Sequence, residues 1–301
     1  VKMVHNGIEY GDMQIIAEIY DLMHRVIGLD ATDIAELFER WNEGRLGSFL
    51  TEVTARVLRV RDEKSGQPLV EMILDQAGQK GTGRWTARDA IDLGEPVPTL
   101  TAAVDARVLS SWKPLRSRAA ALLTGPEART GALSAADRRQ MIKDLEAAFY
   151  ASRVCAYLQG LRLIRVASDA FDWNVDLLRV TQVWKAGCII RARLLDPIRA
   201  VLEQPDSVDG GSWEHLLLDA RLAGPLVEAQ AAWRRVVSDA ALRGVPSPAI
   251  GASLSYFDGL RSSRLPQNLT QAQRDYFGAH TYRRVDDPSG AAVHTDWHDL
   301  T

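Results

Sequence analysis

Apolar residues recur every three to four positions along most of this chain, which is the spacing of an amphipathic helix. The stretch from Met13 to Gly28 shows this spacing and stops at a glycine, as helices often do. The same spacing predicts further helices over residues 32–43, 46–62, 67–77, 99–123, 135–170, 175–186, 188–203, 213–239, 247–262 and 270–280.

Strands are not indicated, because alternating apolar and polar positions are nearly absent. Prolines fall mostly at the boundaries of the predicted helices, and segments 124–137 and 204–212 have the composition of loops. Residues 283–301 show little helical periodicity, so they form an extended tail that something else must hold in place. We therefore predict an all-α fold, with one large helical domain over residues 1–282 and a C-terminal tail over 283–301.

Two short patterns occur twice in the same order. The pattern D-x7-W-x2-G occurs at 33–44 and 176–187, and G-x-P-x-P occurs at 94–98 and 244–248. Self-similarity at a nearly constant displacement indicates a duplicated unit. We expect two similar helix sets, over about residues 11–110 and 140–262, with Trp41 and Trp184 as equivalent core anchors.

The composition agrees with a globular protein and excludes several function classes. The chain has 301 residues, 46% of them hydrophobic, which is enough to bury a large core. A formal net charge of -3 gives no overall reason to expect nucleic acid or an anionic membrane as a partner. The only cysteines, Cys155 and Cys188, make neither a disulfide framework nor a zinc motif, which favours the cytoplasm. Because the chain starts at Val1 without an initiator methionine, we expect something upstream to be missing.

A polar stripe near the amino end is the first candidate site. Lys2, His5, Asn6, Glu9 and Tyr10 stand at i, i+3, i+4, i+7 and i+8, so in a helix they share one face. That spacing usually carries apolar core residues, whereas here it presents an amine, an imidazole, an amide, a carboxylate and a phenol. A plain solvated face is the alternative interpretation.

A glycine-rich segment is the second candidate site. Residues 78–85 read GQKGTGRW, in which three glycines let backbone amides approach an anion and Lys80 supplies a positive charge. The spacing matches neither a dinucleotide fingerprint nor a Walker loop. An ordinary tight connection is the alternative.

The third candidate lies near the carboxyl end. Arg274 could hold an oxyanion through two hydrogen bonds, and His280 offers a second donor near neutral pH. The alternative is an amphipathic helix with a surface arginine and a histidine at its end. His294 and His298 have the spacing of a metal-binding helix, but they lack the accompanying glutamate, so we predict no metal site.

Four blocks of sequence, taken in order, closely resemble the 6-phosphogluconate dehydrogenases. They are KMVHNGIEYGDM at 2–13, QKGTG at 79–83 with WT at 85–86, WKAGCIIR at 184–191 and QRDYFGAHTY at 273–282. The resemblance covers nearly all of residues 1–282. It implies the family's all-helical, substrate-binding and dimer-forming C-terminal domain, which is also built from a repeated helix set.

The resemblance further implies oxidative decarboxylation of 6-phosphogluconate to ribulose 5-phosphate and CO2, a step of the pentose phosphate pathway that needs no metal. NADP would be bound mainly by an N-terminal Rossmann domain that is absent from this chain, so the isolated chain would be inactive. Lys2 matches the general base that takes the proton of the 3-hydroxyl, and Glu9 matches the acid that protonates C1 of the enediol to give ribulose 5-phosphate. A lysine acts as a base only when neutral, which requires burial or neighbouring cations.

The remaining candidate residues match the family's ligand contacts. His5 and Asn6 resemble its contacts to the sugar-acid end, and Asn6 is also expected to face the cofactor. Tyr10, Lys80 and Arg107 resemble its phosphate contacts.

Arg274 and His280 would come from the partner subunit of a homodimer. Two alternatives remain open: a helical dimerisation module that binds no substrate, and a related hydroxyacid dehydrogenase with another substrate. The sequence also leaves open the preference for NADP or NAD.

Overall fold

The computed structural model describes residues 1–128, 133–204, 216 and 218–297, and in these residues the prediction of an all-α fold is confirmed. Extended chain pairs there only as isolated bridges, such as the one between Ser48 and Ala192. The helices are α1 (Lys2–Leu22), which continues into the π-helical turn η1 (Met23–Ile27), α2 (Ala31–Glu43), α3 (Phe49–Arg59), α4 (Leu69–Met72), α5 (Thr82–Asp92), α6 (Pro98–Ser110), α7 (Lys113–Leu122), α8 (Ala135–Ala170), α9 (Leu177–Gly187), α10 (Leu195–Leu202), α12 (Ala220–Leu242), α13 (Pro248–Arg261) and α14 (Gln267–Gly278).

The chain divides into two compact units, Val1–Tyr256 and Phe257–Thr301. The predicted boundary at residue 282 and the two repeat halves stay predictions. None of the described helices is long and apolar enough to cross a membrane.

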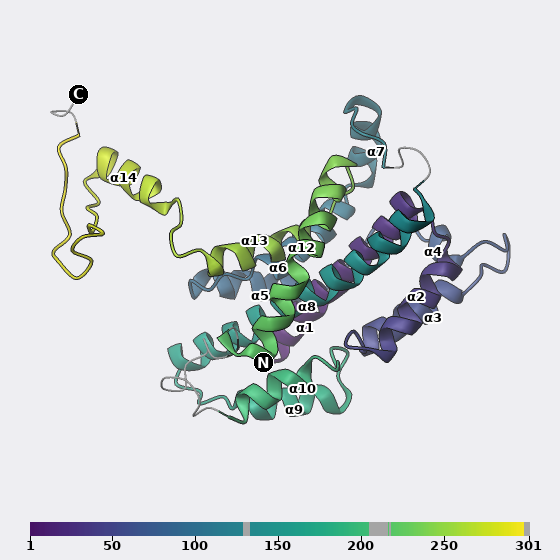
Figure 1. Ribbon diagram of the computed structural model, residues 1–301, viewed down its shortest axis with the longest axis horizontal. Coiled ribbons are helices and arrows are strands. Elements are labelled where there is room, and N and C mark those ends of the chain that lie inside the picture. Colours follow the sequence, from purple (N-terminus) through teal and green to yellow (C-terminus); the bar gives the residue numbers. More distant parts are fainter. Residues whose placement is uncertain (129–132, 205–215, 217, 298–301) are drawn as a thin grey trace. The chain divides into compact units, whose positions relative to one another are not determined.

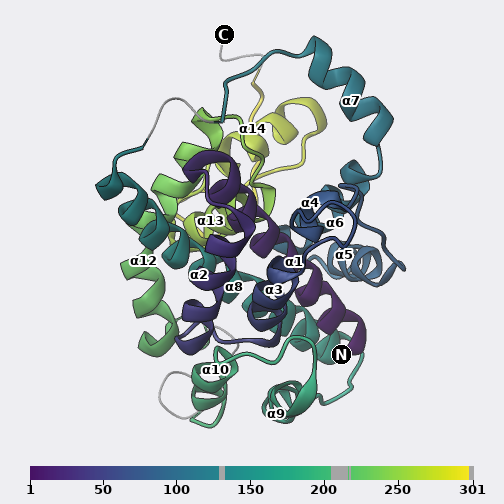
Figure 2. The same ribbon diagram turned by 90° about the vertical axis from the view of Figure 1, so that its right-hand side faces the viewer.

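In the first unit, α1 and α8 pack side by side, and α5, α6 and α12 pack against them (Figure 1). α2 and α3 pack against each other beside this core, and α9 and α10 lie at the end where α1 begins (Figures 1 and 2). The core is continuous because α1 and α8 each present buried aliphatic residues along most of their length. This packing fixes the position of the first turns of α1, where the polar stripe lies.

A buried ion pair joins α1 to α8. Arg153, with 1% of its side chain exposed, donates from Nε to Asp12 Oδ1 over 2.7 Å. Its remaining nitrogens donate to the carbonyl oxygen of Leu46 at 2.8 Å and to Thr51 Oγ1 at 3.2 Å. Burial raises the pKa of Asp12, and the nearby charge of Arg153 opposes that rise. The pair therefore ties α1, α8 and the α2–α3 corner together.

At the start of two helices of the core, backbone N–H groups donate to a side chain of another helix. Glu18 of α1 accepts from the backbone N–H groups of Ala249 at 2.8 Å and Ile250 at 2.9 Å, at the start of α13. Gln159 of α8 accepts from the N–H of Thr99 at 3.1 Å, at the start of α6, and donates to its hydroxyl at 2.9 Å. The first N–H groups of a helix have no partner inside it, so both starts are completed by tertiary contacts.

The repeated sequence patterns form similar local structures. Trp41 and Trp184 are both buried. Gly94 and Gly244 both have left-handed backbone, and the residue after each donates to a carbonyl oxygen five residues back in the preceding helix. These similarities are local, and the duplication of the whole helix set stays a prediction.

Several predicted helix boundaries are wrong. The helix expected over 99–123 is broken at Ser111 and Trp112, because Pro114 must lie in the first turn of a new helix. Only Leu69–Met72 is helical in the segment 67–77, and the helix expected from 188 begins at Leu195. Helix α5 was not predicted. Of the helix expected over 213–239, residues 213–215 and 217 lie outside the described residues, as do most of segment 204–212 and part of 124–137.

Candidate active site

The polar stripe lies on one face of α1, because that helix begins at Lys2. Successive helical residues are rotated by about 100°, so Lys2, Asn6 and Glu9 lie near the centre of this face, with His5 and Tyr10 at opposite edges. Lys2 is exposed, His5, Asn6 and Glu9 are half-buried, and Tyr10 is buried. The face is therefore open in the middle and packed at its edges.

His5 forms one edge of the face, beside Trp184 of α9. The two rings meet edge to face, with centroids 5.9 Å apart. His5 Nδ1 lies 3.0 Å from Asn6 Oδ1, whereas the buried His5 Nε2 has no hydrogen-bond partner among the described residues. Since buried polar atoms are nearly always hydrogen-bonded, a ligand hydroxyl or carboxylate would satisfy this nitrogen. Trp184 was predicted only as a core anchor, and its contact with His5 was not expected.

Tyr10 forms the other edge, and the structure brings it together with Arg107 and the glycine-rich segment. The Arg107 guanidinium carbon lies 3.5 Å from the centroid of the Tyr10 ring. Arg107 also donates from Nη1 to the carbonyl oxygen of Gly78 at 3.3 Å. Gly83 packs so closely on Tyr10 that any Cβ there would overlap the ring. Lys80 lies between these two contacts in sequence and is exposed.

Thr86 fixes α5 against the first turns of α1. Its buried hydroxyl donates to the carbonyl oxygen of Met3 at 2.9 Å. A Cβ on Gly7 would come within 2.6 Å of Thr86 Cγ2, which explains a glycine that otherwise lowers the helix propensity of α1. Sequence reasoning missed Thr86, and the unexplained glycine at position 7 was the only local signal of a close neighbour.

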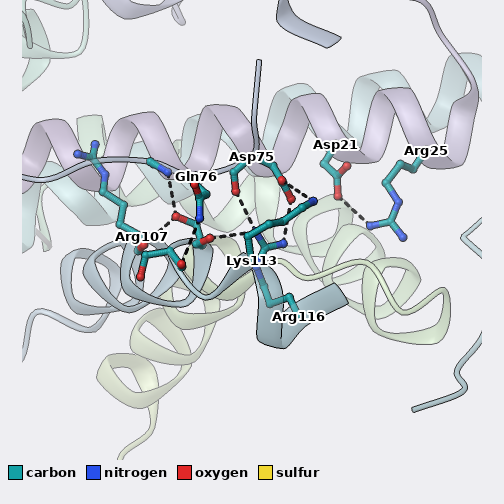
Figure 3. A network of polar contacts seen from close by, with 10 residues as sticks. Asp21, Arg25, Asp75, Gln76, Arg107, Lys113 and Arg116 are labelled. Atoms are coloured by element: carbon teal, nitrogen blue, oxygen red, sulfur yellow. Dashed lines mark hydrogen bonds and ion pairs between the residues drawn. The ribbon is translucent and has the colours of Figure 1, made fainter. Parts of the chain in front are cut away.

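A second set of contacts holds the segment that leads to Lys80 (Figure 3). Asp75 accepts from Lys113 at 2.6 Å and from Arg116 at 2.9 Å, and these two cations lower the pKa of Asp75 to about 2. Arg116 also donates to the carbonyl oxygen of Asp75 at 2.9 Å, and the Gln76 amide donates to that of Ser111 at 3.2 Å. The segment is thus attached to the α6–α7 corner at one end and to Arg107 at the other. Residues about 40 positions apart leave no local pattern, so the sequence did not indicate this network.

Arg274 and His280 lie in the second unit, Arg274 within α14 and His280 two residues beyond its last residue. Arg274 is exposed and donates to Gln271 Oε1 at 3.0 Å. His280 follows the helix, and its exposed ring stands edge to face with Phe277, with centroids 6.3 Å apart. The other seven predicted site residues all belong to the first unit.

Metal ligands do not cluster in the described part of the chain: no group of three or more His, Cys, Asp or Glu residues could hold an ion there. His294 is described, but His298 lies outside the described residues. For a dinucleotide, the stripe offers Asn6, whose Oδ1 is engaged by His5 while its amide nitrogen makes no hydrogen bond with described residues. Among the described residues, this amide nitrogen is therefore available to a ligand.

A cavity of about 520 Å³ also adjoins the start of α1, but none of the predicted site residues lines it. Its walls are mostly apolar and include Met3, Val4, Leu163 and Trp173. The predicted site is therefore the exposed face of α1 and not this cavity.

Comparison with known proteins gives consistent results. A family model described as "6-phosphogluconate dehydrogenase, C-terminal domain" matches residues 1–297. The chain is 48% identical to "6-phosphogluconate dehydrogenase, decarboxylating" of Synechococcus elongatus, over 99% of this chain and 61% of that protein. It is 43% identical to the "6-phosphogluconate dehydrogenase, NADP(+)-dependent, decarboxylating" of Bacillus subtilis, again over 99% of this chain and 61% of that protein.

A solved structure is also similar. Plasmodium falciparum 6-phosphogluconate dehydrogenase, solved in its apo form, with its cofactor NADP+ and with its substrate 6-phosphogluconate, superimposes with a TM-score of 0.88 at 40% identity. The match covers 98% of this chain and 62% of that one. The chain thus spans about three fifths of the length of these relatives.

Proposed function

Because this chain belongs to the 6-phosphogluconate dehydrogenase family, we propose that it forms the helical substrate-binding part of an enzyme that converts 6-phosphogluconate to ribulose 5-phosphate and CO2 with NADP. The observation that carries the proposal is the face of α1, where Lys2 and Glu9 stand two turns apart between the His5 edge and the Tyr10–Arg107 edge. An amine, a carboxylate and anion-binding groups around one open surface suit acid–base chemistry on a phosphorylated sugar acid.

In this proposal Lys2 takes the proton from the 3-hydroxyl of the substrate. Bound NADP supplies the acceptor for the hydride that leaves C3. The resulting 3-keto acid loses CO2 by breaking its C1–C2 bond, and the electron pair of that bond passes to the enediol. Protonated Lys2 beside the C3 oxygen stabilises the negative charge that develops there, so in this proposal the decarboxylation needs no metal ion. Glu9 then protonates the former C2 of the substrate, which becomes C1 of ribulose 5-phosphate.

Substrate binding is assigned to the two edges of the face. The phosphate would lie between Lys80 and Arg107 near the hydroxyl of Tyr10, because the structure brings Arg107 and the Lys80 segment to the same side of α1. The sugar-acid end would lie toward His5 and Asn6, where His5 Nε2 has no hydrogen-bond partner in the described part of the chain.

NADP is assigned mainly to a dinucleotide-binding domain outside this chain, with Asn6 as the contact that the helical part contributes. Lys2 is exposed here, so closure of that domain over the face would supply the burial that a neutral lysine requires.

A cytoplasmic homodimer is the proposed assembly, in which Arg274 and His280 of one subunit complete the site of the other. Helix α14 supports an interface, since Leu269 is 62% and Phe277 73% exposed on it, two turns apart.

The first test is the Lys2→Ala variant of the full-length enzyme, assayed by NADPH formation from 6-phosphogluconate. We expect kcat to fall by about a hundredfold or more, the usual contribution of a general base. Lys64→Ala makes the same change in an exposed loop and should leave turnover unchanged. Wild-type turnover of Lys2→Ala would reject the assigned base.

Calorimetry distinguishes an enzyme from a dimerisation module. Titration with 6-phosphogluconate should release more heat than titration with gluconate, which lacks the phosphate. Lys80→Ala should reduce only the additional heat that depends on the phosphate. A wild-type protein that shows no such difference would favour the module.

Mixing Lys2→Ala with His280→Ala tests the shared site, at a substrate concentration so low that each variant alone has little activity. Random exchange of subunits between Lys2→Ala and His280→Ala makes half of the dimers mixed, each with one intact site, so about a quarter of the wild-type activity should return. No recovery would place His280 in the site of its own subunit.

A further inference from the structure

The second unit is organised around a buried carboxylate, Asp275, on α14. Its Oδ1 accepts from the Thr281 N–H at 2.8 Å and from His294 Nδ1 at 3.0 Å. Its Oδ2 accepts from the Thr295 N–H at 3.1 Å and from Trp297 Nε1 at 2.9 Å. Burial of the carboxylate opposes its ionisation, but the four donors outweigh that effect and hold the pKa of Asp275 well below its usual range. An ionised side chain thus gathers donors from two separate segments.

The first of these segments is the turn that carries His280. Ala279 and Thr281, on either side of it, both have positive φ angles, 49° and 58°, which residues with a Cβ rarely adopt. Such backbone persists only where surrounding contacts determine it. Asp275 supplies two of these contacts, because its carbonyl oxygen accepts from the Ala279 N–H at 2.9 Å and its carboxylate accepts from Thr281. The Gln271 amide supplies a third by donating to the carbonyl oxygen of Thr281 at 2.6 Å.

The second segment is the tail at 293–297. Tyr282 and Val293 exchange two backbone hydrogen bonds of 2.9 Å, which bring the tail back to the turn after α14. The side chains of Tyr282 and Thr295 are hydrogen-bonded as well. The tail and the turn are therefore joined through the Asp275 carboxylate, the adjacent backbone bridge and the contact between Tyr282 and Thr295.

We propose that Asp275, held by His294 and Trp297, is a positioning residue that fixes the strained turn and thereby the direction of His280. The inference rests on the proposed function, in which His280 contacts the substrate. It assigns a role to the tail motif HTDW at 294–297: its histidine is a donor to a structural carboxylate.

The test compares kinetic constants of the full-length dimeric enzyme for Asp275→Asn, His280→Ala and the double variant. Asparagine keeps the shape of the side chain but replaces one acceptor oxygen with a donor, so the turn loses part of its support. We expect Asp275→Asn to raise the KM for 6-phosphogluconate about tenfold, with a smaller change in kcat and an unchanged KM for NADP. In the His280→Ala background the same substitution should raise KM little further, because a residue that acts through His280 has no effect once His280 is gone.

The control is Asp286→Asn, which removes a carboxylate from an exposed ion pair with Arg284 in the same tail and should leave KM unchanged. Trp297→Phe removes a single donor and should give a smaller, equally non-additive rise in KM, which keeps the inference testable if Asp275→Asn folds poorly. A rise that is the same with and without His280 would contradict positioning and indicate a general structural role.

Wild-type KM for Asp275→Asn together with a raised KM for His280→Ala would overturn this inference alone. Wild-type KM for His280→Ala would contradict the proposed function, and with it the role given to Asp275.

Discussion

Replacing Glu18 with glutamine should remove one specific component of the pH dependence of stability. Glu18 is 2% exposed and its carboxylate accepts from two backbone N–H groups at the start of α13 and from Gln14. Burial raises its pKa from 4.5 to about 7, although the hydrogen bonds from Ala249, Ile250 and Gln14 act in the opposite direction. The folded protein therefore keeps a proton on Glu18 at pH values where the unfolded chain has lost it.

The sign of the effect follows from this difference in bound protons. As pH rises from 4.5 toward 7, the unfolded state binds fewer protons than the folded state, so the free energy of unfolding falls. Between about pH 5 and about pH 8 the loss amounts to about 2.5 kcal/mol for a carboxyl whose pKa moves from 4.5 to about 7. Glutamine does not titrate, so this component disappears in Glu18→Gln.

The assay is urea unfolding followed by circular dichroism at several pH values for the wild type and Glu18→Gln. The difference in unfolding free energy between the two proteins cancels all other titrating groups. We expect this difference to shift by about 2.5 kcal/mol in favour of the variant as pH rises from about 5 to about 8. Glu36→Gln, the same change at an exposed position of α2, should give a flat difference.

A flat difference for Glu18→Gln would refute the reasoning, because it would mean that burial does not govern the ionisation of Glu18. A shift in favour of the wild type at high pH would show that the backbone hydrogen bonds outweigh burial and that Glu18 caps α13 as an anion.

Three further substitutions test the packing and the network around the candidate site. Gly160→Ala places a Cβ into the side chain of an isoleucine of α1 and should lower the free energy of unfolding by about 1–3 kcal/mol. Gly224→Ala in α12 meets no neighbour among the described residues and should be neutral or stabilising in thermal unfolding. Asp12→Asn leaves the charge of buried Arg153 without its partner and should cost about 3–5 kcal/mol in urea unfolding; a loss below about 1 kcal/mol would contradict the ion pair. Asp75→Asn should raise the KM for 6-phosphogluconate severalfold without lowering the melting temperature measurably, since exposed ion pairs contribute little stability; unchanged KM would separate this network from the phosphate site.

The sequence predicted those helices whose apolar residues are large and regularly spaced. The helix over 135–170 was predicted with its observed bounds, because α8 buries aliphatic and aromatic side chains along its length. Helix α5 was missed because its buried positions are Gly83, Thr86, Ala87 and Ala90, whose small side chains give no apolar stripe. Residues 188–194, before α10, were wrongly assigned to a helix. Ala192 forms a backbone bridge with Ser48, and local periodicity does not reveal a contact between such distant parts of the chain.

The same distinction applies to the candidate site. The shared face of Lys2, Asn6 and Glu9 follows from local periodicity, and the structure contains the helix on which it depends. The packing of Arg107 on Tyr10 required either a family resemblance or coordinates, because the two residues are 97 positions apart in sequence. The assigned roles of the site residues stay predictions until the variants are measured.

The starts of α6 and α13 take hydrogen-bond acceptors from α8 and α1, so fragments of the chain would depend on each other. A cut in the connection between α7 and α8 would yield an amino-terminal piece with Glu18 and Thr99 and a carboxyl-terminal piece with Gln159 and Ala249. The amino-terminal piece would lack Gln159, the acceptor for the start of α6, and the carboxyl-terminal piece would lack Glu18, the acceptor for the start of α13. Each piece would carry the acceptor that the other one needs. Reassembly of the two pieces would restore both, but only the burial of Glu18 would become more costly as the solution became more alkaline, because the amide of Gln159 has no proton to lose in that range.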